Sequence, residues 1–231
     1  MGTFKNTPIG DIVTRDFRAA EVFKKVGIDF CCGGKQTLEE ACAARKIDIE
    51  TLQAELNSLS DRPSTGMPNF NEWELDFLCD YIERTHHKTV RRLLPELSVY
   101  IDKIYQVHGL NHPELAEIHR LFTELKYELT QHLHNEETVL FPAIKEALKS
   151  NSEESRRIIE SEIKRMDAEH EFAGGAMDQI NVLTNGYTLP ADGCNTYMVA
   201  YKLLEEFEDD LHIHVHLENN ILYPKSLIIY K

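Results

Sequence analysis

Two short segments of the sequence resemble each other and carry residue types that bind metal ions. His132 to Pro142 reads HLHNEETVLFP, and His214 to Pro224, 82 residues later, reads HVHLENNILYP. Five of the eleven positions are identical, and three more exchange Leu for Val, Val for Ile and Phe for Tyr. An internal repeat of this kind predicts two related helical hairpins.

Each copy of the repeat contains a His-x-x-x-Glu pair, His132 with Glu136 and His214 with Glu218. Residues four apart lie on one face of a helix, so the imidazole and the carboxylate can point at the same spot. A carboxylate has two oxygens and can bridge two cations, which an imidazole cannot do. The pairs therefore indicate a metal site with bridging glutamates.

A lone histidine precedes each pair by nearly the same interval. His87 lies 45 residues before His132, and His170 lies 44 residues before His214. Four inward-facing histidines and two glutamates predict a dinuclear metal site inside a helix bundle. Imidazole and carboxylate suit iron, manganese or zinc, and the sequence does not separate them. Zinc prefers four ligands, so the open positions left by six shared ligands favour redox-active iron.

Either His86 or His87 can be the first histidine of the set. His87 continues an apolar seam of its helix, which is why we favour it over His86, although His86 also fits a helical register. The sequences Glu83-x-x-His86 and Asp167-x-x-His170 weakly resemble ferritin-like carboxylate sites. The remaining histidines are interpreted as solvated or hydrogen-bonded: His108, His112, His119, His134, His212 and His216.

The elements that must position these residues are all predicted to be helices. No segment alternates with a period of two, and four long helical segments between residues 71 and 231 predict an antiparallel four-helix bundle. They are expected to start at Asn71, Pro113, Ser152 and after Pro190, and to end near Gly109, Lys149, Asn185 and Pro224. The sequence pattern of residues 1–60 predicts a small helical domain, with a capping box at Thr37 and Glu40. The prolines and glycine of residues 61–70 predict a linker.

Charge and hydropathy exclude several classes of protein. The 231 residues contain 25 Lys and Arg against 39 Asp and Glu, a net charge of −14, which argues against nucleic-acid binding. The sequence contains no apolar run long enough for a membrane span, and Met1 to Asp11 has no apolar core of a signal peptide. We therefore expect a cytoplasmic protein with reduced cysteines.

Adjacent thiols form a second candidate site. Cys31 and Cys32 lie in the segment DFCCGG, Asp29 to Gly34, where the glycines would let a loop turn both thiols outward. A disulfide between neighbouring cysteines is strained and easily reduced. The pair is either incidental or a reactive site that holds iron, accepts a nitrosyl or passes electrons. The other cysteines, Cys42, Cys79 and Cys194, are expected to be buried.

The repeated motifs resemble hemerythrin-type bundles. Together with the DFCCGG segment they resemble the RIC family, the bacterial repair-of-iron-centres proteins (ScdA-like), over nearly the whole chain. The resemblance implies a short N-terminal domain before a hemerythrin-like four-helix bundle with two non-haem iron ions and an oxo, hydroxo or water bridge. Carried over by motif, the ligands are His87, His132, His170 and His214, with Glu136 and Glu218 as bridges.

The resemblance also implies repair of iron–sulfur clusters damaged by nitric oxide or peroxide. Partners would be damaged iron–sulfur proteins or cluster scaffold proteins, with NO or O2 as small ligands, and the protein would be a homodimer. Two alternatives stay open: a hemerythrin-like carrier or sensor of O2 or NO, and a di-iron NO reductase, so enzyme status is undecided. Weak physical support for the dimer comes from four phenylalanines of the first unit: Phe4, Phe17, Phe23 and Phe30.

Overall fold

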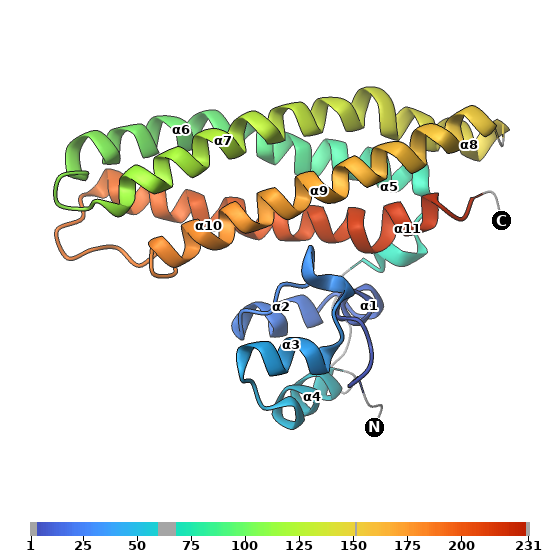
Figure 1. Cartoon of the computed structure of the whole chain (residues 1–231), viewed down its shortest axis with the longest axis horizontal. Coiled ribbons are helices and arrows are strands. Elements are labelled where there is room, and N and C mark those ends of the chain that lie inside the picture. Colours follow the sequence, from blue (N-terminus) through green and yellow to red (C-terminus); the bar gives the residue numbers. More distant parts are fainter. Residues whose placement is uncertain (1–3, 60–67, 151, 230–231) are drawn as a thin grey trace.

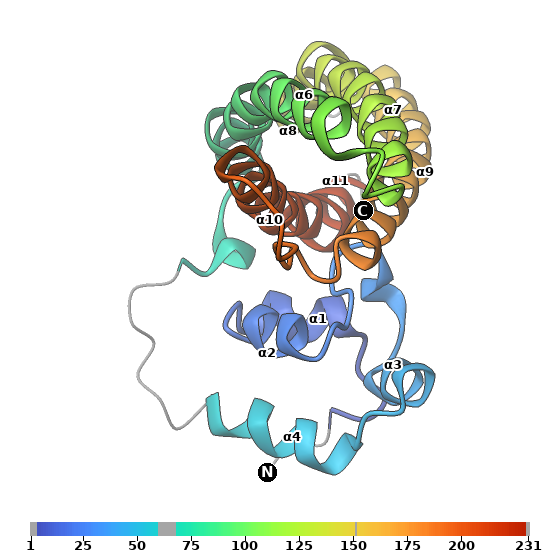
Figure 2. The same ribbon diagram turned by 90° about the vertical axis from the view of Figure 1, so that its left-hand side faces the viewer.

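The computed structural model describes residues 4–59, 68–150 and 152–229. Every regular element in these ranges is a helix, and one isolated β-bridge joins Pro8 to Thr37. A long four-helix bundle forms the larger part, and a small helical unit made by the N-terminal residues packs along one side of it (Figures 1 and 2). The predicted all-α class is confirmed. No helix in the described ranges combines the length and the hydropathy needed to cross a bilayer.

Three of the four arms of the bundle contain a π-helical turn between two α-helical stretches. The arms are α5 (Leu75–Ile82), η4 (Glu83–His87) and α6 (Lys88–His108); α7 (Glu114–Asn135), η5 (Glu136–Leu140) and α8 (Phe141–Ser150); α9 (Glu153–Leu183); and α10 (Asn195–Leu217), η6 (Glu218–Leu222) and α11 (Tyr223–Ser226).

The π turns coincide with the candidate site. His87 ends η4, Glu136 begins η5 and Glu218 begins η6. Each of the last two turns is followed within two residues by a proline, Pro142 or Pro224, which has no N–H to donate to the helix. Sequence periodicity predicts continuous helices here, because the apolar residues on each side of a five-residue turn recur at helical spacing and the turn itself is too short to show a period of its own. Single π turns of this kind are frequent at functional sites.

Burial of an apolar seam explains why these segments are helical and packed together. In the first arm the seam is wholly buried, through Val90, Leu94, Leu97, Ile101 and Ile104. The predicted starts at Pro113 and Ser152 are also found, and the Ser152 hydroxyl accepts the N–H of Ser155. The predicted cap at Asn71 is wrong, since residues Phe70–Glu72 form a 3₁₀ turn (η3) and α5 begins only at Leu75.

The buried side chains of the bundle form two apolar clusters, one toward each end. Along the first arm the clusters stop at Ile82 and resume at Val90, and along the second they stop at Leu133 and resume at Leu140. The candidate ligands fall inside these gaps. A layer of buried polar residues therefore separates the two apolar clusters, and it lies between apolar walls that keep water away.

The N-terminal unit uses its own aromatic residues. Its elements are α1 (Ile9–Arg15), α2 (Ala19–Lys25), η1 (Gly33–Lys35), α3 (Leu38–Arg45) and α4 (Ile49–Ser58), and the capping box of Thr37 with Glu40 is present. Phe23 and Phe30 are buried within the chain, and Phe17 packs edge-on against Phe70. Phe23 and Phe30 therefore offer no surface to a second copy, Phe4 and Phe17 are partly buried against the same core, and the homodimer stays a prediction. Residues 61–67 of the predicted linker lie outside the described ranges.

Asn220 fastens the N-terminal unit to the bundle. Its side chain projects from η6 into a slot beside Gly10 and Gly34, and its Nδ2 lies 3.3 Å from the carbonyl oxygen of Phe30 and 3.4 Å from that of Cys31. A Cβ added at Gly10 would lie 2.2 Å from the amide oxygen of Asn220, and one at Gly34 would lie 2.7 Å from it. Only glycine leaves room for this contact.

The three cysteines outside the CC pair differ in environment. Cys42 and Cys79 are buried as expected, but Cys194 is exposed, so the expectation of a buried residue there is wrong. Cys194 caps the N-terminus of α10, a position that exposes its side chain to solvent. The backbone N–H of Tyr197 and the His108 ring lower the pKa of Cys194 to about 7.

Replacement of Gly10 by alanine tests the slot. Alanine normally stabilises a helix interior by about 0.5–1 kcal/mol relative to glycine, and Gly175→Ala should do so because nothing lies within 4 Å of its added Cβ. Gly10→Ala should instead lower the free energy of unfolding by ~1–3 kcal/mol, because the methyl group overlaps Asn220. Urea unfolding measures both. Equal effects of the two substitutions would contradict the slot, whereas Gly10→Ala with Asn220→Ala should regain part of the loss.

Alkylation of the native protein tests the thiol environments. Iodoacetamide should modify Cys194 first, with a rate that rises through an inflection near pH 7, the pKa of that thiol. Cys79 should not react without unfolding, because burial raises its pKa and blocks access. Mass spectrometry of quenched samples identifies the modified residue. His108→Ala should move the inflection upward, and an unmoved inflection would contradict the role of His108.

Candidate metal centre

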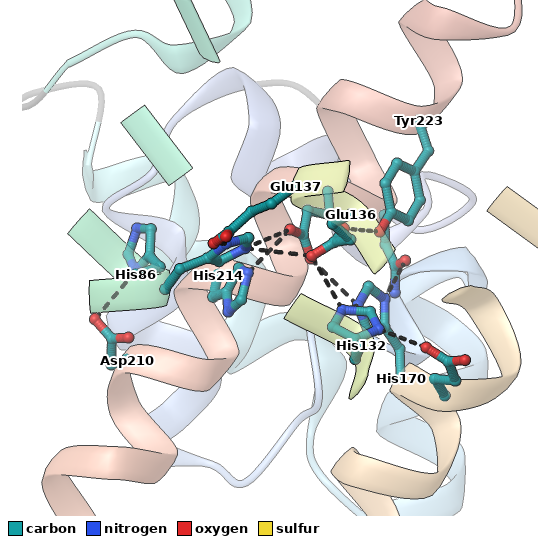
Figure 3. Close-up of polar contacts among 12 residues, drawn as sticks. His86, His132, Glu136, Glu137, His170, Asp210, His214 and Tyr223 are labelled. Carbon is teal, nitrogen blue, oxygen red and sulfur yellow. Dashed lines mark hydrogen bonds and ion pairs between the residues drawn. The ribbon is translucent and has the colours of Figure 1, made fainter. Parts of the chain in front are cut away.

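The structure brings the six predicted metal ligands together in the polar layer between the two apolar clusters. All six are at most 1% exposed, and they come from all four arms; Figure 3 labels His132, Glu136, His170 and His214 among them. Their nitrogen and oxygen atoms form two groups, each with all ligand atoms within 4.8 Å of one another. The first group is His87, Glu136, His214 and Glu218, and the second is His132, His170 and Glu218.

The two carboxylates lie between two pairs of histidines, which we call half-site A (His87 and His214) and half-site B (His132 and His170). Glu218 Oε1 is 2.9 Å from His214 Nε2, and its Oε2 is 3.2 Å from His170 Nε2. Glu136 Oε2 is 3.2 Å from His87 Nε2 and 3.3 Å from His132 Nε2. Each carboxylate therefore contacts both half-sites, as a bridge between two metal ions must.

Several buried atoms at the centre need a cation. Within the described ranges, His87 Nε2, Glu136 Oε2 and Glu218 Oε2 make no hydrogen bond, although all three are shielded from solvent. The Nε2 atoms of His132 and His170 face each other at 3.1 Å. Buried polar atoms without partners are costly, and metal ions at this centre would satisfy all of them. The residues therefore fit a pair of metal ions held by nitrogen and oxygen.

Charge at the centre is balanced inside the cluster. Burial opposes ionisation of Glu136, and so does Glu218, but the His132 and His87 rings outweigh both and lower the pKa of Glu136 to about 2. Conversely, burial disfavours the charged form of His87 and His132, yet the glutamates raise the pKa of each ring to about 10. Metal ions binding here would take the place of these protons.

Side chains around the cluster fix the orientation of most of its histidines. Three of the four direct Nδ1 at a side-chain oxygen: His87 at Glu137 (2.7 Å), His132 at Glu169 (2.7 Å) and His170 at Asn219 (2.8 Å). Such contacts hold the ring with Nε2 toward the metal and raise its basicity. Sequence reasoning missed these partners, although Glu137 and Asn219 occupy the same position of the repeat.

The neighbouring histidines take other roles. His86 is buried but turns away from the cluster, with its Nδ1 3.0 Å from Asp210 Oδ1 (Figure 3), so it is His87 that lies among the glutamates. Asp167, of the weak Asp167-x-x-His170 motif, contacts Lys35 instead. The histidines interpreted as solvated or hydrogen-bonded all lie outside the two ligand groups: His108, His112, His119, His134, His212 and His216.

Cys31 and Cys32 face the bundle, so the expectation that both thiols point outward is wrong. Asn220 contacts the backbone of their loop, and the loop lies beside α9. There Cys32 Sγ lies 3.3 Å from the carbonyl oxygen of His170. Cys31 Sγ lies 3.8 Å from Cys32 Sγ and is buried. The contact with Cys32, burial and the Asp29 carboxylate together raise the pKa of Cys31 well above that of a free thiol.

Asp29 organises the thiol loop. Its Oδ1 accepts the backbone N–H groups of Cys31 (2.8 Å) and Cys32 (3.1 Å), and its Oδ2 accepts that of Gly33 (2.7 Å). The Asp29 carboxylate and the two sulfurs lie within 4.8 Å of one another, which makes them a further group able to bind a metal ion. Asp29 is not among the site residues predicted from the sequence, because its contribution depends on the fold of the loop.

Comparisons with known proteins agree with both parts of this architecture. Residues 5–60 match ScdA_N, a domain of unknown function (DUF542), and residues 80–226 match the hemerythrin HHE cation binding domain. Proteins named iron-sulfur cluster repair protein YtfE, from Enterobacter sp. (strain 638) and Citrobacter koseri, are each 34% identical to this chain over 227 and 228 residues. The protein of that name from Escherichia coli O8 is 34% identical over 224 residues.

These matches extend over whole proteins. In each of the three, the matched region covers 97% of this chain and 98% of the relative. The cation-binding domain contains all six clustered residues, and the N-terminal match contains the thiol loop. This chain therefore belongs to the RIC (repair of iron centres) family.

Proposed function

We propose that this protein repairs damaged iron–sulfur clusters with two iron ions held by the six buried histidines and glutamates. The observation that carries the proposal is the arrangement of Glu136 and Glu218, each in contact with both half-sites at a centre whose buried atoms need cations. The relatives named for cluster repair match the chain nearly from end to end, which supports the same role here.

The donor set supports iron at both half-sites. Two histidines and shared carboxylates at each ion leave coordination positions open. Bound there, two adjacent iron ions supply reversible redox chemistry and a binding position for NO or O2. The protein's own residues hold the ligands in place: the Tyr223 hydroxyl donates to Glu136 Oε1 at 2.7 Å, and the apolar clusters on both sides exclude water.

Iron donation is the form of repair that we favour. When an ion leaves, protons on His87 and His132, whose pKa the glutamates raise to about 10, can balance the buried carboxylates. Cys31 and Cys32 supply soft ligands next to His170, at the seam between the N-terminal unit and the bundle. We propose that these thiols accept iron or electrons on the way to a damaged cluster.

The position of the thiols also bears on the alternatives. A carrier or sensor of O2 or NO has no need of a thiol pair packed on the backbone of a metal-ligand helix, so the contact between Cys32 and His170 favours repair. An NO reductase would use the same iron ions but would turn over repeatedly with an electron donor. Single-turnover product would not distinguish it from repair.

Domain organisation, oligomeric state, partners and compartment belong to the same proposal. The chain works as two domains, residues 1–60 and 71–231, joined by residues 61–70, and it acts as a homodimer on damaged iron–sulfur proteins or cluster scaffold proteins. All five cysteines are free, which supports a reducing compartment and hence the cytoplasm.

Metal analysis tests the di-iron centre. Protein purified anaerobically should contain about two iron ions per chain, the number that two half-sites bridged by shared carboxylates can hold. Glu136→Ala should lose most of this iron, because it removes a ligand that contacts both half-sites. His134→Ala is the matched control, since its ring lies two residues beyond His132 and outside the cluster. Zinc in the native protein, or equal loss in both variants, would overturn the proposal.

Repair assays test the thiol pair. The double substitution of Cys31 and Cys32 by serine should keep the iron content but abolish restoration of a damaged cluster enzyme. Cys194→Ser should leave repair unchanged, because Cys194 is exposed at the start of α10, away from His170. Iron-free protein should fail in the same assay. Full repair by iron-free protein would exclude iron donation, and full repair by the double variant would exclude the thiols.

A further inference from the structure

The repeat in the sequence is also a repeat in space. Residues at matching positions make matching contacts: the Phe141 ring stacks on His87 at 5.6 Å and 17°, and the Tyr223 ring stacks on His170 at 5.9 Å and 3°. Glu137 and Asn219, each directly after a bridging glutamate, contact Nδ1 of those same histidines. The two half-sites can therefore be compared residue by residue.

One pair of matching positions breaks the symmetry. Glu169, directly before His170, accepts from Nδ1 of His132. The matching residue before His87 is His86, and it contacts the ring of His214, the histidine that matches His132. This contact is a parallel stack at 5.5 Å and 8°, not a hydrogen bond.

His214 is consequently left without an acceptor. Its Nδ1 is buried and makes no hydrogen bond to any residue of the described ranges. His86 does not serve as the acceptor, because its ring lies parallel to that of His214; its Nδ1 contacts Asp210 and its Nε2 makes no hydrogen bond within the described ranges. Half-site B therefore has a side-chain oxygen behind each of its histidines, whereas half-site A has one behind His87 alone.

This difference bears directly on metal affinity. An acceptor behind a ligand histidine fixes its tautomer and orientation and raises its basicity, and loss of such a partner typically costs about 10- to 100-fold in metal affinity. The acceptor behind His87 in half-site A is the charged Glu137, whereas the acceptor behind His170 in half-site B is the neutral Asn219. The charge of Glu137 partly offsets the missing acceptor of His214. A neutral acceptor still orients its ring, and His214 has none.

We infer that the two half-sites are unequal and that the ion bound between His87 and His214 leaves first. The inference rests on the proposed di-iron function and deepens it, because it assigns the donated iron to half-site A and the retained iron to half-site B. Cys32 contacts the backbone of His170, in half-site B. The thiol pair therefore lies beside the retained ion, and it would accept the first ion only after that ion has left half-site A.

Partial removal of iron from the full-length protein tests the assignment. The ferrous protein is incubated with bipyridine until one equivalent remains, and crystals are measured at wavelengths on both sides of the iron absorption edge. The remaining anomalous peak should lie between His132 and His170. A peak between His87 and His214, or equal peaks at both positions, would overturn the inference while leaving the di-iron proposal intact. Protein that binds no iron would overturn both.

Variants separate the acceptor from other differences between the half-sites. Glu169→Leu removes the acceptor of His132, so the slow phase of iron release into bipyridine should accelerate about 10- to 100-fold and approach the fast phase. Glu171→Leu, at an exposed position on the same helix, is the matched control and should change neither phase. An unchanged slow phase in Glu169→Leu would contradict the role of the acceptor.

A gain-of-affinity variant and a thiol variant complete the test. His86→Gln offers His214 a side-chain oxygen in place of the stacked ring, so the fast phase should become slower. The double Cys31→Ser and Cys32→Ser protein should release its first ion at the native rate. Faster first release in His86→Gln, or a changed first phase in the thiol variant, would count against the assignment of that ion to half-site A.

Discussion

Two carboxylates buried at the centre of a helix bundle are the constraint on which this structure depends. Glu136 and Glu218 have no exposed surface, and isolated buried charges of like sign are strongly unfavourable. Four histidines from four arms compensate for them, and three of these histidines have a side-chain oxygen behind their rings. The polar layer, the π turns that shape it and the apolar clusters that enclose it all follow from placing these two charges there.

The cluster of six histidines and glutamates could be predicted from the sequence because it depends on local periodicity. His132 and Glu136 are four residues apart on one helix, and the repeat supplies His214 and Glu218 in the same way. The acceptor Glu169 lies on a different arm from His132, so no local sequence pattern predicts the contact between them. The π turns escaped prediction for another reason, since each spans only five residues between segments of ordinary helical period.

The orientation of the thiol loop could not be predicted from local sequence either. The glycines after Cys32 indicate a turn, but the direction of that turn is set by Asn220, about 190 residues away along the chain. Gly10 and Gly34 make the slot, and Asp29 holds the loop from inside. A contact between segments so distant in sequence decides that Cys32 meets His170. The role predicted for Cys31 and Cys32 stays a prediction, and the outward direction predicted for their side chains is wrong.

Three successive residues of η6 face three different parts of the molecule. Glu218 contacts both half-sites, Asn219 orients His170, and Asn220 holds the N-terminal unit. An α-helix advances by about 100° per residue, so a shift of this turn by one residue would point Asn220 away from its slot. The wide turn thus makes the register of one helix the common condition for an intact metal site and a docked thiol loop.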